Sequence, residues 1–545
     1  MKLSKLKKKL QVKYMLFMFF AIGLSTATYA QDKELSWEAL GKQYEIPKWF
    51  TDARFGIWVH WGAQTVPEYG GGWYARHMYM QDVGKETFGK NAYPYHLKTF
   101  GHPSEVGYKD VANAWKAENL DTDKLLKYFT EDLGAKYFMA LAHHHDNFDN
   151  WNSKYQPWNS VNVGPKRDII GEFSKSAKKQ GVPFGVSTHN ERFFEWGLPA
   201  FGADTSGVYK GIPYDGRLTK EDGIGTWWEG LDPSDLYGLP PEKRTPEWEE
   251  AWKQNWLLRM KDLLTNYDVD FMWFDGRGFP YGAYGKEAFR TYLNHRLNKD
   301  GKINALIAGK IPGGDPAIVN DIEQGVELEI NPEPWQSICS FTHWFYKKDD
   351  PSRHDSRSTI ELLIDVVSKN GNFMLNVELL PDGTIPPEHK AIMDEFGAWL
   401  KLNSEAIYAS KPWKVHGDNF FSGFLDENSN ASNLANTDQI ENQKKKSKQF
   451  NNRTKDSEPY GHDEVRFTTK DGVLYIFVMN PSEGDIKLSS LGLKSKYKPK
   501  KIQSIKLIGS DETINFKQDH NNLILSVPAK RPNKYAAVFE VKGAL

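Results

Sequence analysis

The chain has almost no cysteine and no excess of charge of either sign. Cys339 is the single cysteine among 545 residues, so no disulfide can form within the chain. A lone thiol in a strand-like stretch is more often a small buried hydrophobe than a nucleophile. The 70 Lys and Arg residues nearly balance the 71 Asp and Glu residues. Such a balance offers no basic surface for nucleic acid or for an anionic membrane.

Long apolar runs are also missing, apart from a short one near the N-terminus. Residues 15–24 are apolar, but this run is too short to span a bilayer as an ordinary helix. Six lysines precede it and Thr28-Tyr29-Ala30 follows it, which is the layout of a bacterial signal peptide over residues 1–30. Removal of those lysines lowers the formal charge from −1 to −7. No cysteine follows the cut, so we expect a periplasmic or secreted protein without a membrane anchor.

Length and composition predict a globular protein with more than one domain. A chain of 545 residues exceeds one compact core, so we expect two domains, with a third possible. Aromatic residues make up 14% of the chain and include 19 Trp. Aromatic rings beside His, Asp and Glu suit sugar binding, because the C–H face of a sugar packs on a ring while its hydroxyls need polar partners. Most of these rings would still be core residues of a large barrel.

Short apolar runs alternate with helical stretches between residues 31 and 410. Helical spacing occurs in residues 123–133, 169–180, 247–267, 359–368 and 391–403. This alternation predicts an α/β fold, a (β/α)₈-like barrel of TIM type that is irregular where no helix separates two runs. The expected strands are residues 55–62, 135–142, 183–189, 269–276, 305–308, 317–321, 337–341 and 372–377.

The pattern changes after residue 410. Residues 428–460 are rich in Asn, Ser, Lys and Gln, which is typical of an exposed insertion. Short alternating runs then predict a small antiparallel β-sandwich as the domain of residues 411–545. The expected strands are residues 465–468, 473–479, 501–507, 523–527 and 535–541.

Histidines follow three of the barrel runs, at the strand ends where such barrels carry their chemistry. His60 ends the first run, His143, His144 and His145 end the second, and His189 ends the third. Consecutive residues of an extended chain point to opposite sides, so three adjacent histidines cannot all bind one ion. We therefore predict hydrogen bonding to a ligand, no metal and no cofactor, and a structural role for at least one of the three.

The run at residues 269–276 ends in Asp275, which we expect to face the same cleft. Taken alone, this aspartate would more often cap a helix or a turn, and the other strand ends shift that balance toward a cleft. Retaining glycoside hydrolysis needs one ionised carboxylate and one protonated carboxyl a short distance apart. Glu323, which follows a later run, is the candidate for the second group. Rivals in the same segment, which spacing does not separate, are Glu327, Glu329 and Glu333.

Six longer segments carry a more specific signal. They read FGIWVHWGAQTVPEYGGGWYARHMY from Phe55, HHHDNFDNWNSKY from His143, GPKRDIIGEF from Gly164, WFDG from Trp273, SKNGNFMLNVELLPDG from Ser368 and NSEAIYASKPW from Asn403. In this order they resemble the signature segments of the α-L-fucosidases, glycoside hydrolase family 29. The resemblance covers most of residues 40–413 and extends weakly over the C-terminal strands.

The resemblance implies a retaining exo-hydrolase that removes terminal α-L-fucose from fucosylated oligosaccharides or glycoconjugates. By motif position, Asp275 matches the nucleophile. Glu323, in the segment DIEQG, is our choice for the acid/base in a stretch that varies within the family. Three histidines, His60, His144 and His145, match residues that bind fucose hydroxyls. The remaining residues expected at the sugar site are Trp73, His189, Trp273 and Trp344.

The chain also departs from the family pattern. A sugar-binding Glu usually precedes the family's Trp-Tyr motif, where this chain has Gly72, with Glu68 nearby. The family's lysine before the His pair is His143 here, and the glycine after His-Asp is Asn147. These differences bear on the substrate more than on the reaction type.

Three hypotheses therefore remain open at the level of sequence. The first is a secreted α-L-fucosidase. The second is a barrel glycosidase for a related sugar such as α-L-galactose, which a polar rather than an apolar wall around C6 would favour. The third is a glycan-binding protein without catalysis, which Gly72 motivates and which the presence of Asp275 and a candidate acid opposes.

Overall fold

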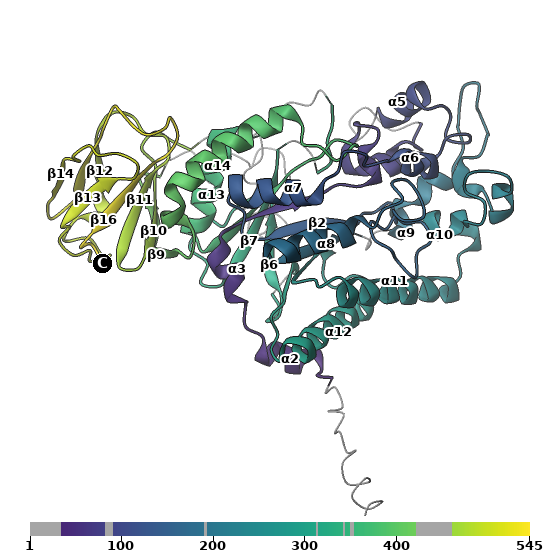
Figure 1. Ribbon diagram of the computed structural model, residues 1–545, viewed down its shortest axis with the longest axis horizontal. Coiled ribbons are helices and arrows are strands. Elements are labelled where there is room, and N and C mark those ends of the chain that lie inside the picture. Colours follow the sequence, from purple (N-terminus) through teal and green to yellow (C-terminus); the bar gives the residue numbers. More distant parts are fainter. Residues whose placement is uncertain are drawn as a thin grey trace, which may run out of the picture.

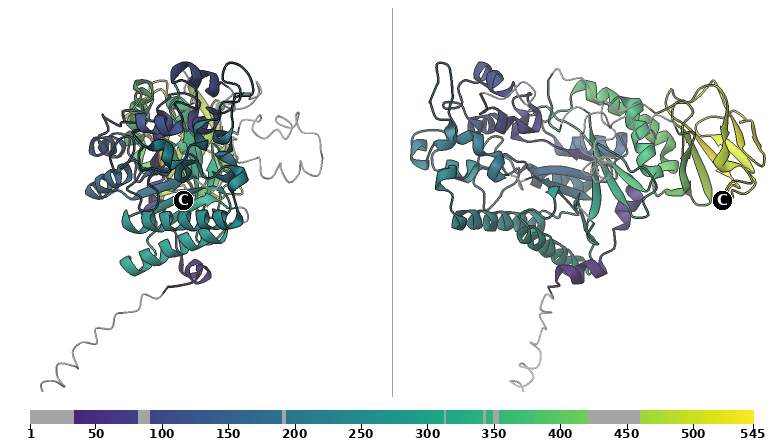
Figure 2. Two further views of the ribbon diagram at one scale, coloured as in Figure 1. Left: turned by 90° about the vertical axis from the view of Figure 1, so that its right-hand side faces the viewer. Right: turned by 180° about the vertical axis from the view of Figure 1, so that it is seen from behind.

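The structure is a computed structural model that describes residues 34–81, 91–189, 193–311, 314–341, 344–348, 354–420 and 460–545. The predicted signal peptide, and residues 428–459 of the predicted insertion, lie outside the described residues. Figure 1 shows a central barrel with the C-terminal strands packed at one end and a group of short helices at the other. The two further views in Figure 2 show the same order of parts along the long axis.

Eight parallel strands close into a barrel in chain order, as the sequence predicts. Each strand pairs with the next one along the chain, and β1 also pairs with β8, so that Phe55 lies beside Phe373. The strands are β1 (Phe55–Val59), β2 (Phe138–His143), β3 (Phe184–Thr188), β4 (Phe271–Arg277), β5 (Leu306–Lys310), β6 (Val319–Glu323), β7 (Trp335–Ser340) and β8 (Gly371–Asn376).

Large side chains fill the barrel, so it is a packed core rather than a channel. Trp58 of β1, Phe271 of β4 and Met374 of β8, and Tyr137 just before β2, are almost fully buried there. Gly56 of β1 leaves the room for one of them, because a Cβ atom at this position would lie only 2.4 Å from the ring of Tyr137. The aromatic content noted in the sequence is therefore explained in part by the core.

Helices cover the outside of the barrel. The long ones match the helical stretches expected from spacing, except for α12, which was not predicted. Within the described residues, no helix separates β5 from β6 or β6 from β7, which is the expected irregularity. The helices that follow barrel strands are α8 (Ile169–Gln180), α11 (Pro246–Asn266), α12 (Ala283–Asp300), α13 (Ser356–Ser368) and α14 (Pro387–Ile407).

The connections at the carboxyl ends of the strands fold into a separate layer (Figure 1). One buried carboxylate ties this layer together: Asp215 accepts from Tyr79 Oη at 2.6 Å and from Tyr237 Oη at 2.7 Å. The short helices are α2 (Trp37–Gln43), α3 (Lys48–Ala53), α4 (Tyr74–His77), α5 (Ala92–Thr99), α6 (Tyr108–Ala114), α7 (Thr122–Lys127), α9 (Phe193–Trp196) and α10 (Pro233–Tyr237). Of these, α5, α6, α9 and α10 form the layer.

The C-terminal strands form two antiparallel sheets with an apolar core between them. The larger sheet has the order β13-β16-β11-β10-β9 and the smaller one β12-β15-β14. Three of these strands, β9, β12 and β14, were not predicted. The strands are β9 (Lys411–Asp418), β10 (Val465–Lys470), β11 (Val473–Val478), β12 (Gly484–Leu488), β13 (Ser504–Leu507), β14 (Phe516–Gln518), β15 (Leu523–Val527) and β16 (Ala537–Lys542).

The larger sheet is fastened to α13 and α14 of the barrel. Arg466 of β10 is fully buried and donates to Asp365 of α13 at 2.5 Å and to Glu464 at 2.7 Å. Trp399 of α14 donates to the carbonyl of Ala536 at 3.0 Å. None of the helices in the described residues is long and apolar enough to cross a membrane.

Candidate active site

Asp275 lies near the end of β4, inside a β-bulge. The register between β4 and β5 shifts between Phe274 and Arg277. Gly276, in the bulge, has φ of 117°, a backbone conformation that favours glycine. Bulges at barrel rims re-aim side chains. Here Asp275 and Lys310 at the end of β5 are turned toward each other, with Nζ 2.9 Å from Oδ1.

Lys310 also contacts Glu323 at the end of β6, with Nζ 2.5 Å from Oε2. One ammonium group therefore joins the two carboxylates that the sequence singles out. The side chains of Asp275, Lys310 and Glu323 are 15%, 20% and 19% exposed. All three are thus recessed and yet reachable from solvent.

The charges in this group favour an ionised Asp275. Burial by itself would raise the pKa of Asp275, but the Lys310 ammonium and His145, whose Nε2 lies 3.5 Å from Oδ2, hold it well below its usual range. Burial also opposes the charge of Lys310, but Asp275 and Glu323 outweigh it and raise the pKa of Lys310. Asp275 is therefore a carboxylate and Lys310 an ammonium at neutral pH.

Four buried histidines surround Asp275. His60 follows β1, His144 and His145 follow β2, and His189 follows β3, and none is more than 5% exposed. Burial holds the pKa of His60, His144 and His189 well below the usual value, so these rings are neutral. Both ring nitrogens of His60 and Nδ1 of His145 and His189 have no hydrogen-bond partner among the described residues. Buried polar atoms normally have one, so these nitrogens are available to a polar ligand or to water.

Ring nitrogens of His60, His144 and His189 lie within 4.8 Å of one another, which is close enough to hold a metal ion. The hydrogen bonds that Gln64 makes behind these rings argue against metal binding. Gln64 places its amide nitrogen 2.8 Å from Nδ1 of His144, and its oxygen accepts from the backbone N–H of Ala75 at 3.3 Å. Nδ1 of His144 is therefore an acceptor, and the ring proton lies on Nε2. A ligating Nε2 needs a free lone pair, so His144 suits a sugar hydroxyl better than an ion.

Tryptophans line the same group. The Trp273 ring lies 5.0 Å from those of Trp58 and His189, and Trp344 lies 5.7 Å from His60. Trp73, which is half-buried, lies 6.2 Å from His145. The structure thus brings all nine residues predicted for the site to one end of the barrel.

Gly72, the departure from the family motif, adjoins an aromatic ring. A Cβ atom at this position would lie 2.9 Å from Cδ2 of Phe345 and 3.3 Å from Cε1 of His144. The Phe345 ring packs edge-on against His60 at 4.8 Å. A side chain at residue 72 therefore has no room, and an apolar ring stands beside the histidines instead.

The three other glutamates considered for the acid/base role lie in surroundings that differ from those of Glu323. Glu327 accepts from Asn331 Nδ2 at 3.1 Å. Glu329 is 83% exposed and faces His416 of β9, at 3.4 Å, on the side of the sandwich. Glu333 is exposed. Glu323 is the member of this set that contacts Lys310, and through it Asp275.

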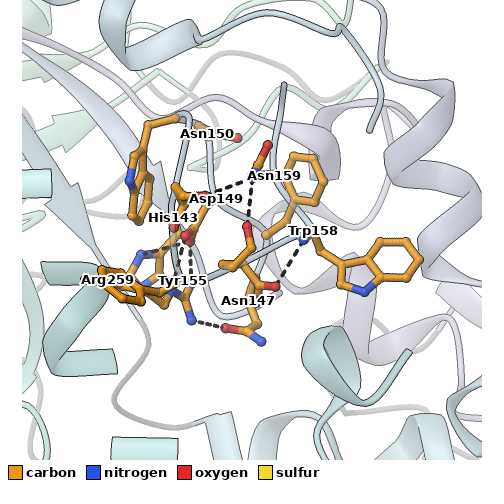
Figure 3. Close-up of polar contacts among 12 residues, drawn as sticks. His143, Asn147, Asp149, Asn150, Tyr155, Trp158, Asn159 and Arg259 are labelled. Atoms are coloured by element: carbon orange, nitrogen blue, oxygen red, sulfur yellow. Dashed lines mark hydrogen bonds and ion pairs between the residues drawn. The ribbon is translucent and has the colours of Figure 1, made fainter. Parts of the chain in front are cut away.

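His143, the first of the three adjacent histidines, is fully buried at the end of β2. Its ring faces Asp149, with Nδ1 3.8 Å from Oδ1, on the outer side of the loop after β2. Figure 3 shows Arg259 of α11 lying between Asp149 and Asn147. Arg259 binds Asp149 through two nitrogens, with Nε 3.1 Å from Oδ2, and donates through Nη1 to Asn147 Oδ1 at 2.6 Å.

Asn147 connects Arg259 of α11 to α10 at the mouth of the barrel. It adopts a left-handed φ of 61° and donates through Nδ2 to the carbonyl of Asp235 in α10 at 2.8 Å. His144 and His145 precede it by three and two residues in the chain. Their loop is therefore held between α11 below and α10 above.

Sequence reasoning missed four residues of this assembly. Lys310 lies just beyond the short run that was expected as a strand, and a lysine that ends an apolar run is the signal that could have found it. Phe345 follows Trp344, which was predicted. Gln64 and Arg259 carry no local signal, because their partners are far away in the chain.

Comparisons with known proteins identify the relatives of this chain. A family model described as alpha-L-fucosidase matches residues 21–405. The alpha-L-fucosidase of Dictyostelium discoideum is 26% identical over 413 residues, which are 74% of this chain and 80% of that protein. The tissue alpha-L-fucosidase of Rattus norvegicus is 27% identical over 417 residues, 73% of this chain and 76% of that one.

Solved structures share the fold. The alpha-fucosidase of Thermotoga maritima has a TM-score of 0.63 and 23% identity over 93% of this chain and 99% of that one. A GH29 alpha-L-fucosidase of Bacteroides thetaiotaomicron, described as a trapped covalent intermediate with 2-fluoro-fucosyl fluoride, has a TM-score of 0.58 and 18% identity over 92% and 99%. The chain is thus a glycoside hydrolase built on a TIM-type barrel with a β-sandwich. Within that class, it belongs to the α-L-fucosidase family, glycoside hydrolase family 29.

Proposed function

We propose that the protein is a retaining, exo-acting α-L-fucosidase in which Asp275 is the nucleophile and Glu323 the acid/base. One observation carries the proposal. Asp275 Oδ1 lies 2.9 Å and Glu323 Oε2 2.5 Å from the same nitrogen of Lys310, so these oxygens are at most about 5.4 Å apart. Retaining glycosidases hold their carboxyl groups roughly 5–5.5 Å apart, whereas inverting ones leave about 6.5–9.5 Å for a water molecule.

In the first step, a carboxylate oxygen of Asp275 attacks the anomeric carbon of the fucosyl residue. Glu323 gives its proton to the glycosidic oxygen as the bond between that oxygen and the anomeric carbon breaks. The products are the free aglycone and a glycosyl ester on Asp275. Lys310 and His145 favour this step because they keep Asp275 ionised before the attack.

In the second step, the ionised Glu323 takes a proton from a water molecule, which attacks the anomeric carbon. The ester bond breaks, Asp275 regains its charge, and fucose leaves with the configuration of the substrate. The trapped covalent intermediate described for the Bacteroides thetaiotaomicron relative supports such a route.

The histidines provide the contacts that orient the sugar. The Nε2 proton of His144 is a donor, and the unpartnered nitrogens of His60 and His189 supply further donors and acceptors. Neutral rings pair with hydroxyls without adding charge beside Asp275. Trp273 and Trp73 offer apolar surface for the C–H face of the ring.

The first test is release of the aryl group and of fucose from an aryl α-L-fucoside. Wild type should release both, with the α-anomer of fucose formed first in a proton NMR time course. Asp275→Ala should lower kcat/KM by about 10⁴-fold or more and remain folded by circular dichroism. Glu329→Ala, at an exposed site near the sandwich, is the matched control and should behave as wild type. An active Asp275→Ala enzyme, or β-fucose as the first product, would contradict the assignment.

The second test separates the candidate acids. Glu323→Ala should be most impaired on substrates with poor leaving groups, and azide should restore turnover and give an α-fucosyl azide. Azide should not change the rates of Glu327→Ala or Glu333→Ala. If azide rescues one of those variants instead, the acid/base role belongs to that residue.

A third test determines which sugar the enzyme prefers as substrate. An aryl α-L-galactoside differs from the fucoside by one hydroxyl at C6, and we expect wild type to prefer the fucoside. A preference for the galactoside would assign the enzyme to that substrate. Binding of fucosylated oligosaccharides without any turnover would instead support a glycan-binding protein.

We also propose export across the inner membrane on residues 1–30, which lie outside the described part of the chain. Support comes from the basic start, the short apolar run and Ala30 at the end of a small-residue motif. Cell fractionation and N-terminal sequencing should find the enzyme outside the cytoplasm and beginning at Gln31. An intact N-terminus in the cytoplasmic fraction would refute this.

A further inference from the structure

Lys310 was not among the residues predicted for the site, although it contacts both Asp275 and Glu323. It is the last residue of β5, and the bulge in β4 sets it opposite Arg277 and beside Asp275. Its ammonium group lies 5.5 Å from the centre of the Trp273 ring. That ring belongs to the same wall as the histidines, so Lys310 lies within the sugar site.

The groups around Asp275 differ in the charge they carry. His60 and His189, from the ends of β1 and β3, are kept neutral by burial. His145, from the end of β2, approaches with Nε2 at 3.5 Å. On β6, Glu323 and the buried Asp321 are acidic. Within the described part of the chain, Lys310 is therefore the lysine or arginine that brings a positive charge into hydrogen-bond distance of Asp275.

The contact between Lys310 and Glu323 determines which oxygen of Glu323 carries the transferable proton. Lys310 Nζ donates to Oε2 of Glu323. In a protonated carboxyl the carbonyl oxygen is the better acceptor, so while Lys310 donates to Oε2, the proton that Glu323 transfers lies on Oε1. Lys310 in this way selects which oxygen faces the leaving group.

We propose that Lys310 is a positioning residue that sets both carboxylates for their separate tasks: it keeps Asp275 ionised, and it turns the proton-bearing oxygen of Glu323 toward the glycosidic bond. The inference rests on the proposed function, in that Asp275 and Glu323 are taken as the reacting pair. Lys310 itself exchanges no proton and forms no bond with the sugar in this role.

The test compares Lys310→Met, which keeps the length of the side chain and removes its charge, with Lys310→Arg, which keeps the charge. The readout is the pH profile of kcat/KM on an aryl α-L-fucoside. Loss of a cation at hydrogen-bond distance should move the acid limb to higher pH by about 1 to 3 units. Lys310→Arg should leave the acid limb where it is in wild type. An unmoved acid limb in Lys310→Met would overturn the first half of the proposal.

The second half is tested with leaving groups. Lys310→Met should lose more activity on alkyl fucosides than on activated aryl fucosides, because only the former need a well-placed proton from Glu323. An equal loss on both would show that Lys310 does not orient Glu323. Lys310→Gln repeats both measurements if Lys310→Met fails to fold by circular dichroism.

The titration of Asp275 can also be followed without turnover. Carbon-13 NMR of protein labelled in its aspartate carboxyls reports the pKa directly, with Asp275→Asn identifying the signal. The pKa should rise in Lys310→Met and not in Lys310→Arg. If wild type releases no fucose, the proposed function fails while this measurement still decides whether Lys310 keeps Asp275 ionised. An Asp275 signal that titrates alike in all three proteins would refute that role.

Discussion

Arg259→Met tests whether the network behind the site stabilises the protein and its loop. In the folded protein Arg259 is 1% exposed and binds Asp149, which is fully buried, and Asn147 (Figure 3). Methionine nearly keeps the length of the side chain but has no hydrogen-bond donor. The substitution therefore leaves one carboxylate and one amide oxygen without their partner in a place that water does not reach.

The size of the effect follows from these partners. Breaking a buried ion pair by removing one member lowers the free energy of unfolding by about 3–5 kcal/mol. The lost bond to the neutral Asn147 adds about 1 kcal/mol. Against a total of roughly 5–15 kcal/mol for a typical protein, this is a large fraction. We expect the variant to fold at low temperature and to unfold at clearly lower urea concentration.

The effect should depend on pH. Burial raises the pKa of Asp149 to about 6, although Arg259 opposes the shift. Without Arg259 the folded-state pKa rises further, while the unfolded value stays near 3.8. A carboxyl with a raised pKa destabilises the folded state increasingly as pH rises from the unfolded to the folded value. The loss in Arg259→Met should therefore be larger at pH 8 than at pH 5.

Urea denaturation of both proteins at pH 5 and pH 8 measures this difference. Arg357→Met, which removes an exposed arginine that bonds to Asn480, is the control and should lose less than about 1 kcal/mol. KM for a fucoside should rise in Arg259→Met, because His144 and His145 lie on the loop that Arg259 holds. A loss in Arg259→Met as small as in the control at pH 8 would refute the reasoning.

Two further predictions concern single positions. Gly72→Ala should raise KM with little change in kcat, because its Cβ would press on Phe345 and His144; a KM equal to that of wild type in steady-state kinetics would contradict the contact distances. Asp321→Asn should gain stability over wild type as pH rises from about 4 to 8, by up to the order of 4 kcal/mol, since burial raises the pKa of Asp321 from 3.8 to about 7. The bond from Gln336 Nε2 to Oδ1, 3.0 Å long, survives in the variant, and parallel pH–stability curves from urea unfolding would count against the prediction.

The barrel could be predicted because its strands are short, apolar and end in polar residues. Each expected run from 55–62 to 372–377 overlaps one barrel strand, within a few residues at either end. The same feature located His60, His189 and Asp275, since a side chain at the carboxyl end of a parallel strand has to face the mouth. The strand at residues 305–308 was expected to end two residues early, and this is why Lys310 escaped notice.

Other elements lacked a local signal or had one that was overlooked. Helix α12 has apolar residues at helical spacing, Phe289, Tyr292 and Leu293, so it could have been predicted. Strand β14 has three residues, too few for a pattern to emerge. The contact between Asp149 and Arg259 joins residues 110 positions apart, and no spacing rule connects such a pair.

The seam between β1 and β8 has a consequence for how the protein is made. The backbone N–H of His60 donates to the side chain of Asn376 at 3.0 Å, and Asn376 in turn donates to the carbonyl of Trp344. A ribosome delivers His60 early, but its partner emerges only after 316 further residues. Until then the barrel is an open sheet with two unpaired edges, and such edges invite pairing with other chains. A folding intermediate in which β8 has not yet paired is thus the form most open to aggregation, and a chaperone that shields the edge of β1 until then should raise the yield of active enzyme.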